Sequence, residues 1–350
     1  MTWEKVPLPQ LVFAPRHYEC LRARLAPTLD GRLDKPFWAH APWTEDFVDI
    51  EGDARPVPAK RTRAKLLWDD ECLYIGARLE EDAIWATQTE RDSVIFRDND
   101  FEVFIDPDGD SHAYYEFEMN ALNTVWDLLL TKPYRDGGRA VNGWDIHGLR
   151  TAVHIDGTIN EPGPQNRFWS LEIAMPWEAL RECAPEARAP VPGDCWRINF
   201  SRVEWRTEVA DGQYRKVICP ETGKPYPEDN WIWSAQGVVN MHYPEFWGFL
   251  AFRDDRMEGF RPHPDEARKW LLRQVYYAER TVFAEEGRFS DSLERLAAVC
   301  PALGDSGDDS GLPMPVVETT RASFLASMPS TDGRRLLTIN EEGRTAHLEV

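Results

Sequence analysis

The chain has 350 residues, with 60 Asp and Glu against 40 Lys and Arg, so its formal net charge is -20. This charge would repel duplex nucleic acid and anionic membranes, and no basic stripe compensates for it, so we expect neither as a partner. No run approaches the roughly eighteen apolar residues of a membrane-spanning helix, and the N-terminus MTWEKVPLPQLVF lacks the apolar core of a signal peptide. A signal removed earlier would leave the same sequence, so the compartment stays open.

Strand patterns dominate the first 255 residues. The N-terminal segment TLDGRLDKPFWAHAPW (28–43) predicts a short strand and a turn at Asp30 and Gly31. It is followed by β-rich segments separated by turn residues: RAKLLW (63–68), CLYIGARL (72–79), FEVFI (101–105), AYYEFEMN (113–120), TVWDLLL (124–130), RTAVHI (150–155), FWSLEIAMP (168–176), WRINFSRVEW (196–205) and FWGFLAF (246–252). Only PWEALRECA (176–184) is typical of a helical turn. Many short strands without long helices between them favour an antiparallel β-sandwich or jelly roll.

The pattern changes after about residue 255. The segment 264–287 has apolar residues at helical spacing, with Pro264 near its start and Gly287 at its end, and predicts a long amphipathic helix. A short helix over 290–300 and a flexible Gly, Ser and Asp-rich loop over 304–313 come next. Three strands end the chain: ASFLASM (322–328), RLLTINEE (335–342) and TAHLEV (345–350). We therefore predict a β domain over residues 1–255 and a small α+β unit over 260–350 packed on it.

The cysteines give no sign of a metal or redox motif, because they are scattered and none forms a CxxC pair. We expect them to be small buried residues, with one or two disulfides as the alternative: Cys20, Cys72, Cys183, Cys195, Cys219 and Cys300. Several of the fifteen tryptophans stand in strand-like or packed segments, which predicts core positions for Trp38, Trp68, Trp169, Trp196 and Trp247.

Alternating acidic residues in FRDNDFEVFIDPDGDSHAYYEFEMN (96–120) resemble a calcium loop at first sight. Counted from Asp106, however, an EF-hand needs Gly where Ser111 stands and a bidentate Glu where Phe117 stands. The flanking residues alternate with period two, so this segment predicts a β-hairpin whose turn is Pro107, Asp108 and Gly109.

The alternation divides the hairpin into two faces. One is apolar and should face the core: Phe101, Val103, Ile105, Tyr115, Phe117 and Met119. The other carries Glu102, Phe104, Glu116, Glu118 and Asn120. Such a face is either solvated surface, the default for alternating charges on a half-buried sheet, or the floor of a polar site.

Seven segments in the same order resemble the family 9 carbohydrate-binding modules and related β-sandwich domains, over roughly residues 28–252. They are LDGRLDKPFW (29–38), AKLLWDDECLYIGARLEED (64–82), FRDNDFEVFIDPDGD (96–110), YYEFEMNALNTVWD (114–127), WSLEIAMPWEAL (169–180), PGDCWRINFSRVE (192–204) and WGFLAF (247–252). The resemblance implies a non-catalytic domain that binds sugar chain ends between two aromatic rings and often carries structural calcium.

The resemblance also implies roles for individual residues. Phe96 stands where the family places one sandwiching tryptophan, and Glu102 where it places an acceptor of sugar hydroxyls, whereas Glu118 replaces an Arg. The segment NMHYPEFWG (240–248) replaces the loop of the second ring, which leaves that role open among His242, Tyr243 and Trp144. The predicted ligand-binding set is Phe96, Glu102, Glu116, Glu118, Asn120, Trp144, His242 and Tyr243, whose rings and carboxylates suit the C–H faces and hydroxyls of a sugar.

Calcium is the one cofactor that we expect, in a structural role. The Asp-rich turns offer hard oxygen donors from Asp98, Asp100, Asp106 and Asp108. Plain solvated turns are the alternative.

Three other functions remain open at this point, one of which is a purely structural or partner-binding role, especially for the C-terminal unit. A glycoside hydrolase or lyase would use Glu102, Glu116 and Glu118, since hydrolysis needs paired carboxylates about 5 to 9.5 Å apart. A haem-binding redox domain of the DOMON type, from the same extended fold group, would draw its ligands from Met119, Met241, His112, His147 and His242. The glycan and the oligomeric state are not encoded in any recognisable pattern.

Overall fold

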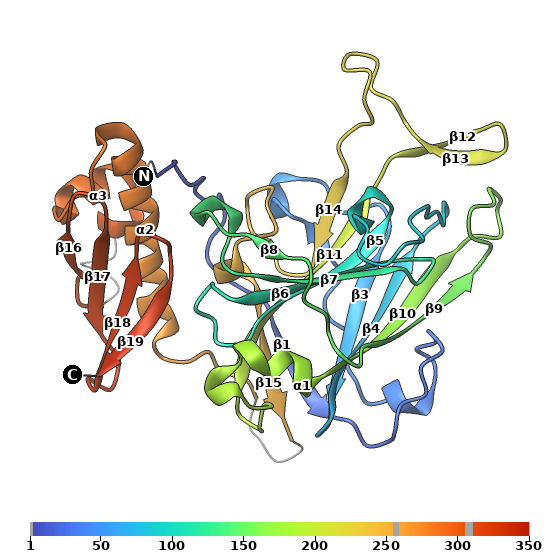
Figure 1. The fold of residues 1–350 in the computed structure, drawn as a ribbon, viewed down its shortest axis with the longest axis horizontal. Coiled ribbons are helices and arrows are strands. Elements are labelled where there is room, and N and C mark those ends of the chain that lie inside the picture. Colours follow the sequence, from blue (N-terminus) through green and yellow to red (C-terminus); the bar gives the residue numbers. More distant parts are fainter. Residues whose placement is uncertain (1–2, 255–258, 305–310, 350) are drawn as a thin grey trace.

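The computed structural model describes residues 3–254, 259–304 and 311–349, and most of this chain is built on one 13-stranded sheet (Figure 1). The strands of this sheet are β1 His17–Arg22, β2 Val48–Asp49, β3 Thr62–Trp68, β4 Cys72–Glu80, β5 Asp100–Asp106, β6 Tyr114–Asn120, β7 Val125–Leu130, β8 Ala140–Val141, β9 Arg150–Asp156, β10 Phe168–Pro176, β11 Cys195–Glu204, β14 Asp229–Ile232 and β15 Gly248–Arg253. A separate hairpin, β12 Thr207–Ala210 and β13 Gln213–Lys216, projects from it, and α1 Trp177–Leu180 is the predicted helical turn.

The sheet is mixed. Its order is β8-β7-β6-β5-β11-β15-β1-β3-β4-β10-β9, with β14 and β2 attached beside β11. The mainly β class is confirmed, but a purely antiparallel jelly roll is not, because β1 lies between β15 and β3 and runs parallel to both. β1 and β3 are parallel because a long irregular connection returns the chain to the starting end of β1 before β3 begins. The sequence did not predict this, because the period-two alternation of a strand is the same in either direction.

The sheet curls so that its two halves enclose the main core. Residues of β3, β4 and β10 share one buried cluster with residues of β5, β6 and β11, for example Leu171 with Phe117. The apolar face predicted for the hairpin lies in this cluster, as expected from its alternation. The five tryptophans predicted to be core residues are all buried: Trp38, Trp68, Trp169, Trp196 and Trp247.

The segment 28–43 contains no strand, in contrast to the prediction. It is a loop held by the buried carboxylate of Glu172, which accepts hydrogen bonds from the backbone N–H groups of Asp30 and Gly31 at 2.8 Å. The same carboxylate binds Lys35 Nζ and Trp38 Nε1 at 2.7 Å. Gly31 adopts φ = +80°, which confirms the predicted turn.

The cysteines are all free, and their exposure differs from one to another. Cys20, Cys72 and Cys300 are buried as predicted, whereas Cys183 and Cys219 are partly exposed. Cys195 is exposed, contrary to expectation, because it is the first residue of β11 at the end of the sheet.

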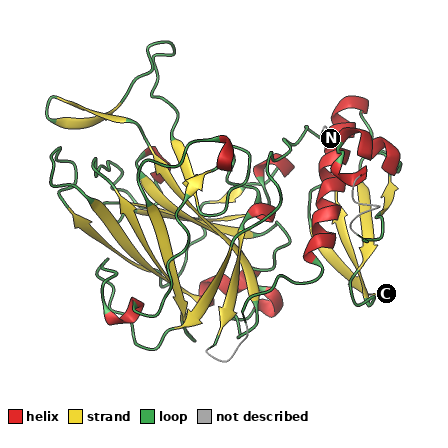
Figure 2. Cartoon of the chain, turned by 180° about the vertical axis from the view of Figure 1, so that it is seen from behind, coloured by secondary structure: helices red, strands yellow, loops and turns green. Residues whose placement is uncertain are grey.

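The described residues of the C-terminal unit include the helices α2 and α3 and a four-stranded antiparallel sheet, and the unit lies beside the large sheet (Figure 2). Its elements are α2 Glu266–Glu286, α3 Leu293–Val299, β16 Val316–Thr319, β17 Phe324–Pro329, β18 Arg335–Asn340 and β19 Thr345–Glu349. The long predicted helix is confirmed as α2, which ends at Gly287 in the left-handed conformation. Most of the predicted loop 304–313 lies outside the described residues. None of the described helices is both long and apolar enough to cross a bilayer.

The C-terminal unit has its own core, in which α2 packs on β17 and β18. Val6, from the other end of the chain, is buried in this core as well. The division at residues 255–260 stays a prediction, and the packing of Val6 shows that the N-terminal segment contributes to both parts.

Buried ion pairs join α2 to the loops that follow β7 and precede β15. Arg280 pairs with Asp136, and both side chains are essentially inaccessible to solvent. Arg135 binds both carboxylate oxygens of Glu245, at 2.8 and 2.9 Å, and Tyr277 of α2 also donates to Glu245. Because buried charges are stable only when they are paired, these contacts fix the position of α2 on the large sheet.

Replacing Arg280 with Met should lower the free energy of unfolding by about 1.5–3 kcal/mol, because the buried carboxylate of Asp136 would lose its Arg280 partner and keep only Arg135 and Tyr276. Urea denaturation followed by tryptophan fluorescence measures this loss. Arg344→Ala is the matched control, because the Arg344–Asp110 pair has an arginine side chain that is 57% exposed and should contribute at most about 1 kcal/mol. Equal losses in the two variants would contradict this account of the junction.

Candidate functional site

The register of β5 against β6 brings the acidic side chains of the hairpin together. Glu102 pairs with Glu118, and the pairs on either side of it are Phe104 with Glu116 and Asp100 with Asn120. The neighbouring strands extend the row, with Ser201 of β11 opposite Glu102 and Trp126 of β7 opposite Glu118. We refer to the surface formed by Asp100, Glu102, Glu116, Glu118, Trp126 and Ser201 as the acidic face.

The acidic face is buried, so the default prediction of a solvated surface is wrong. Glu102 and Glu116 are only 5% and 7% exposed, and Asp100 and Glu118 are exposed less still. A segment far away in the sequence lies beside this face: Trp247, at the end of the segment 238–247, packs against Phe104 with ring centroids 5.6 Å apart. A polar face with this degree of burial belongs to a site rather than to ordinary surface.

Burial and mutual repulsion shift every carboxyl pKa of this face in one direction. Burial raises the pKa of Glu102 to about 7. Burial, with Glu102 close by, raises the pKa of Glu116 to about 8, and it holds the pKa values of Asp100 and Glu118 well above their usual range. Among the described residues, no Lys or Arg forms an ion pair with any of the four, so no cation of the chain offsets the cost of ionising them.

Four buried polar atoms of this face have no hydrogen-bond partner among the described residues. They are Asp100 Oδ2, Glu102 Oε2, Ser201 Oγ and Trp126 Nε1. Buried polar atoms are nearly always satisfied, and a group of unsatisfied ones on adjacent strands indicates a ligand. The face offers two acceptors and two donors, the hydroxyl being able to act as either.

Aromatic residues border the acidic face on one side. Phe96 is 38% exposed, and its backbone N–H donates to Glu118 Oε2 at 3.0 Å. Its carbonyl accepts from the indole of Trp205 at 2.8 Å, and Lys216 Nζ lies 3.2 Å from the centre of the Trp205 ring. Trp205 was not predicted as a site residue, although it directly follows β11, the strand that carries Ser201 of the acidic face, and this position could have indicated it.

The opposite side is formed by His242 and Tyr134. His242 Nδ1 is 2.8 Å from Tyr114 Oη, and its ring makes edge contacts with Tyr134 at 4.5 Å and Phe104 at 5.9 Å. Burial lowers the pKa of His242 to about 3, so the imidazole is neutral at physiological pH. Tyr134 is 48% exposed and was missed, since nothing in the loop after β7 marks it as a partner of His242.

Two residues of the predicted ligand-binding set lie elsewhere. Trp144 stacks on Tyr115, with ring centroids 4.7 Å apart, and therefore lies on the opposite side of the hairpin from Glu102. Tyr243 is buried under the guanidinium of Arg135, at the junction with the C-terminal unit. Local sequence placed both in loops near the site, but the loop paths carry them away from it.

Asn120 lies beside the site but has no free hydrogen-bonding group. Its amide donates to Gln88 O and Asp98 Oδ2, and its oxygen accepts from the N–H groups of Leu122 and Thr124. An Asn side chain with two donor and two acceptor contacts is saturated. The prediction that Asn120 contacts a ligand is therefore corrected: it holds the β6–β7 turn.

The four predicted calcium ligands do not converge. Asp98 is buried and accepts from Thr87 and Gln88 as well as Asn120, so it serves the loop before β5. Asp106 accepts from the backbone of the hairpin turn and groups with Asp108 and Asp110 at the far end of the hairpin. Asp100 instead groups with Glu102 and Glu118.

The predicted haem ligands are also dispersed. Met119 is in the main core, while Met241 lies on the other face of the hairpin, where its sulfur accepts from Gln236. His147 is exposed in a loop, and His112 is buried near Glu342 of the C-terminal unit.

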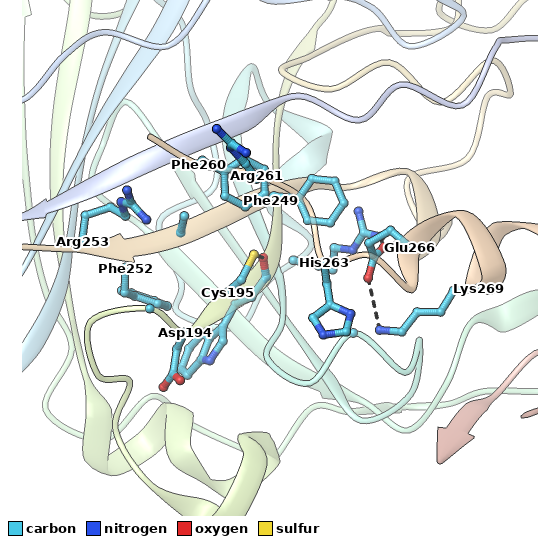
Figure 3. Close-up of a pocket in the computed structure, with 15 residues that line it drawn as sticks. Asp194, Cys195, Phe249, Phe252, Arg253, Phe260, Arg261, His263, Glu266 and Lys269 are labelled. Carbon is cyan, nitrogen blue, oxygen red and sulfur yellow. Dashed lines mark hydrogen bonds and ion pairs between the residues drawn. The ribbon is translucent and has the colours of Figure 1, made fainter. Parts of the chain in front are cut away.

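A separate hollow of about 420 Å³ lies between β15 and the start of α2 (Figure 3). Its lining includes Cys195, Phe249 and His263. Three of its charged groups pair with one another: Glu266 binds Arg197 at 2.7 Å and Lys269 at 3.2 Å. None of the predicted site residues lines this hollow, which distinguishes it from the acidic face.

Replacing Asn120 with Ala should lower the free energy of unfolding by about 1–3 kcal/mol, because four hydrogen-bonding groups would lose their partner in a buried turn. Urea denaturation tests this value. Leu122→Ala, in the same turn and more than one third exposed, is the control and should change stability by at most about 0.5 kcal/mol. If Asn120→Ala left the free energy of unfolding unchanged, this amide would not be what holds the turn.

Comparison with known proteins shows that part of this sheet is similar to a known family. The model for carbohydrate family 9 binding domain-like sequences matches residues 29–154. A solved structure of a proposed carbohydrate-binding protein from Bacteroides uniformis is 15% identical, with all of that chain and 69% of this one aligned and a TM-score of 0.49.

A family 9 carbohydrate-binding module from Caldicellulosiruptor kristjanssonii, solved with glucose and with cellotriose, is 14% identical in both cases, with 70% of this chain and all of that chain aligned and TM-scores of 0.42 and 0.41. No curated protein matches the chain. Residues 29–154 are thus similar to the carbohydrate family 9 binding domains, which confirms the resemblance found in the sequence.

Proposed function

We propose that the protein binds a carbohydrate, without cleaving it, on the acidic face and the aromatic residues that border it. The observation that carries this proposal is the pairing of a half-exposed ring, Phe96, with buried carboxylate oxygens that have no partner. Sugars need both features, because their C–H faces stack on rings and their hydroxyls donate to carboxylates. The family match over residues 29–154 supports the same function.

Each group of the face has a role that its chemistry allows. Phe96 would stack on the sugar, and Glu102 would accept a hydroxyl through its unpaired oxygen. The indole of Trp126 and the hydroxyl of Ser201 would donate to sugar oxygens, and both groups would thereby gain the hydrogen-bond partner that they lack. Tyr134 and His242 would close the side opposite Phe96, in the role that the family gives to a second ring.

The alternative of glycan hydrolysis is less well supported by the same carboxylates. Hydrolysis requires one carboxyl group that stays protonated and another that stays ionised, so their pKa values must be driven apart. Here burial raises the pKa values of Glu102 and Glu116 to about 7 and about 8, and that of Glu118 moves in the same direction. Because all three pKa values are raised, the set does not contain one carboxyl group suited to be the acid and another suited to be the nucleophile.

A glycan array that includes mono- and disaccharides is the first test, with glucose and cellotriose in the panel. A ligand found there should bind reversibly in calorimetry and be recovered intact after long incubation. Recovery of shortened products would contradict a purely binding function and return the carboxylates to the hydrolase interpretation.

For a ligand found in this way, Glu102→Gln should weaken binding by about 1.5–3 kcal/mol, the range for hydrogen bonds to charged groups, or roughly ten- to over a hundredfold. Phe96→Ala should weaken it by about tenfold through loss of the stacking surface. Isothermal titration calorimetry measures both, and the melting temperatures should hardly move.

The control is Trp144→Ala, because Trp144 lies on the other side of the hairpin and its loss should leave the affinity unchanged. If Trp144→Ala abolishes binding while Glu102→Gln and Phe96→Ala bind normally, the ligand site is not the acidic face.

A further inference from the structure

Three carboxylates of the acidic face converge on one point. Asp100, Glu102 and Glu118 each place one oxygen within 4.8 Å of the oxygens of the other two. Two of these residues also carry an unpartnered oxygen, Asp100 Oδ2 and Glu102 Oε2, and both side chains are more than nine-tenths buried. The three carboxylates thus meet at a point where two of their oxygens still lack a bonding partner.

The negative charge of this group is not balanced by the protein. Another buried group in the same sheet shows how the chain balances such charge: there Glu81 and Glu204 are paired with Arg202 and Lys60. Within the described part of the chain, no cation is paired with Asp100, Glu102 or Glu118. Ionising several such carboxylates at one buried point is strongly unfavourable unless a positive charge from outside the chain balances them.

Protonation alone does not account for the arrangement. A proton shared between two carboxyl groups forms a short hydrogen bond between their oxygens. Asp100 Oδ2 and Glu102 Oε2 make no such bond to each other. A bound cation would satisfy these oxygens at the same time as it balances the charge.

We infer that Asp100, Glu102 and Glu118 bind a divalent cation, and that this cation is calcium. A set made only of carboxylate oxygens selects a hard ion, because zinc and copper favour His and Cys ligands. Calcium accepts irregular oxygen geometry, whereas magnesium demands a near-ideal octahedron and gives up its water reluctantly. This site differs from the calcium predicted in the Asp-rich turns, since it contains two glutamates of the sheet and excludes Asp98, Asp106 and Asp108.

The inferred ion would lie on the floor of the acidic face, directly beside the unpaired oxygen of Glu102 that is proposed to accept a sugar hydroxyl. Calcium has six to eight coordination positions, so three carboxylates leave positions for water or hydroxyl oxygens. Sugar binding would then depend on calcium. This second part of the inference rests on the proposed function, whereas binding of the ion itself does not.

The test begins with calcium alone. The full chain, treated with EGTA and dialysed, is titrated with calcium chloride in a calorimeter, in the absence of any sugar. We expect one site, and we expect Asp100→Asn and Glu118→Gln to bind calcium at least tenfold more weakly, because affinity follows the number of charged ligands. These isosteric amides remove repulsion, so in EGTA both variants should melt no lower than the wild type.

Asp108→Asn is the matched control, since it removes one carboxylate from the other acidic group of the hairpin, Asp106, Asp108 and Asp110, and should leave calcium binding unchanged. Absence of calcium binding at millimolar concentrations would overturn the inference. It would also be overturned if Asp108→Asn abolished binding while Glu118→Gln bound normally.

A titration with sugar distinguishes the proposed carbohydrate binding from the inferred dependence on calcium. The glycan identified on the array is titrated once with calcium and once with EGTA, and we expect at least tenfold weaker binding in EGTA. Calcium binding without any glycan binding would count against the proposed function alone. Glycan binding that is equally tight with and without calcium would overturn the calcium dependence inferred here.

Discussion

The antiparallel pairing of β5 with β6 is the constraint on which the rest of the site depends. It places Glu102 opposite Glu118, and it does so because the alternate residues of both strands, such as Phe101 and Met119, are buried in the main core. A slip of one residue would move the carboxylates into that core and the aromatic rings out of it. The apolar face of the hairpin thus sets the register that gathers the charges on the other face.

Gathering these charges opposes stability, and the fold keeps them in place by other means. The hairpin is central in the sheet, between β11 and β7, and the curled halves of the sheet bury a continuous core beneath it. Another buried pair of carboxylates, Glu81 and Glu204, is neutralised by Arg202 and Lys60. Several carboxylates gathered at one point without such partners are characteristic of a functional site, where local stability is given up for binding.

The segment 238–247 connects the site with the C-terminal unit. On one side, His242 contacts Tyr114 next to the acidic face. On the other, Glu245 binds Arg135 and Tyr277 of α2. Because these contacts are only a few residues apart, the ion pairs that hold α2 also hold the wall of the site. The C-terminal unit is therefore part of the structural support of the ligand face, although its own core is separate.

Local sequence alone determined the elements and their faces. Period-two alternation predicted the β5–β6 hairpin and which of its residues face the core, and helical spacing with Gly287 as the end signal predicted α2. These features follow from the geometry of neighbouring residues, which the order of residues encodes directly. The family resemblance, carried by several such segments in order, was found in the same way.

Tertiary structure decided the features that depend on contacts between distant residues. The direction of β1, the packing of Trp247 on Phe104 beside the acidic face and the position of Trp144 on the other side of the hairpin all depend on long connections whose path no local pattern describes. Asp100 groups with Glu102 and Glu118 rather than with Asp98, because Asp98 lies before the strand and is saturated by the loop at Thr87 and Gln88. Alternation tells which face a side chain occupies, but only the packing of segments from other parts of the chain determines what covers that face and which of its polar atoms remain without a partner.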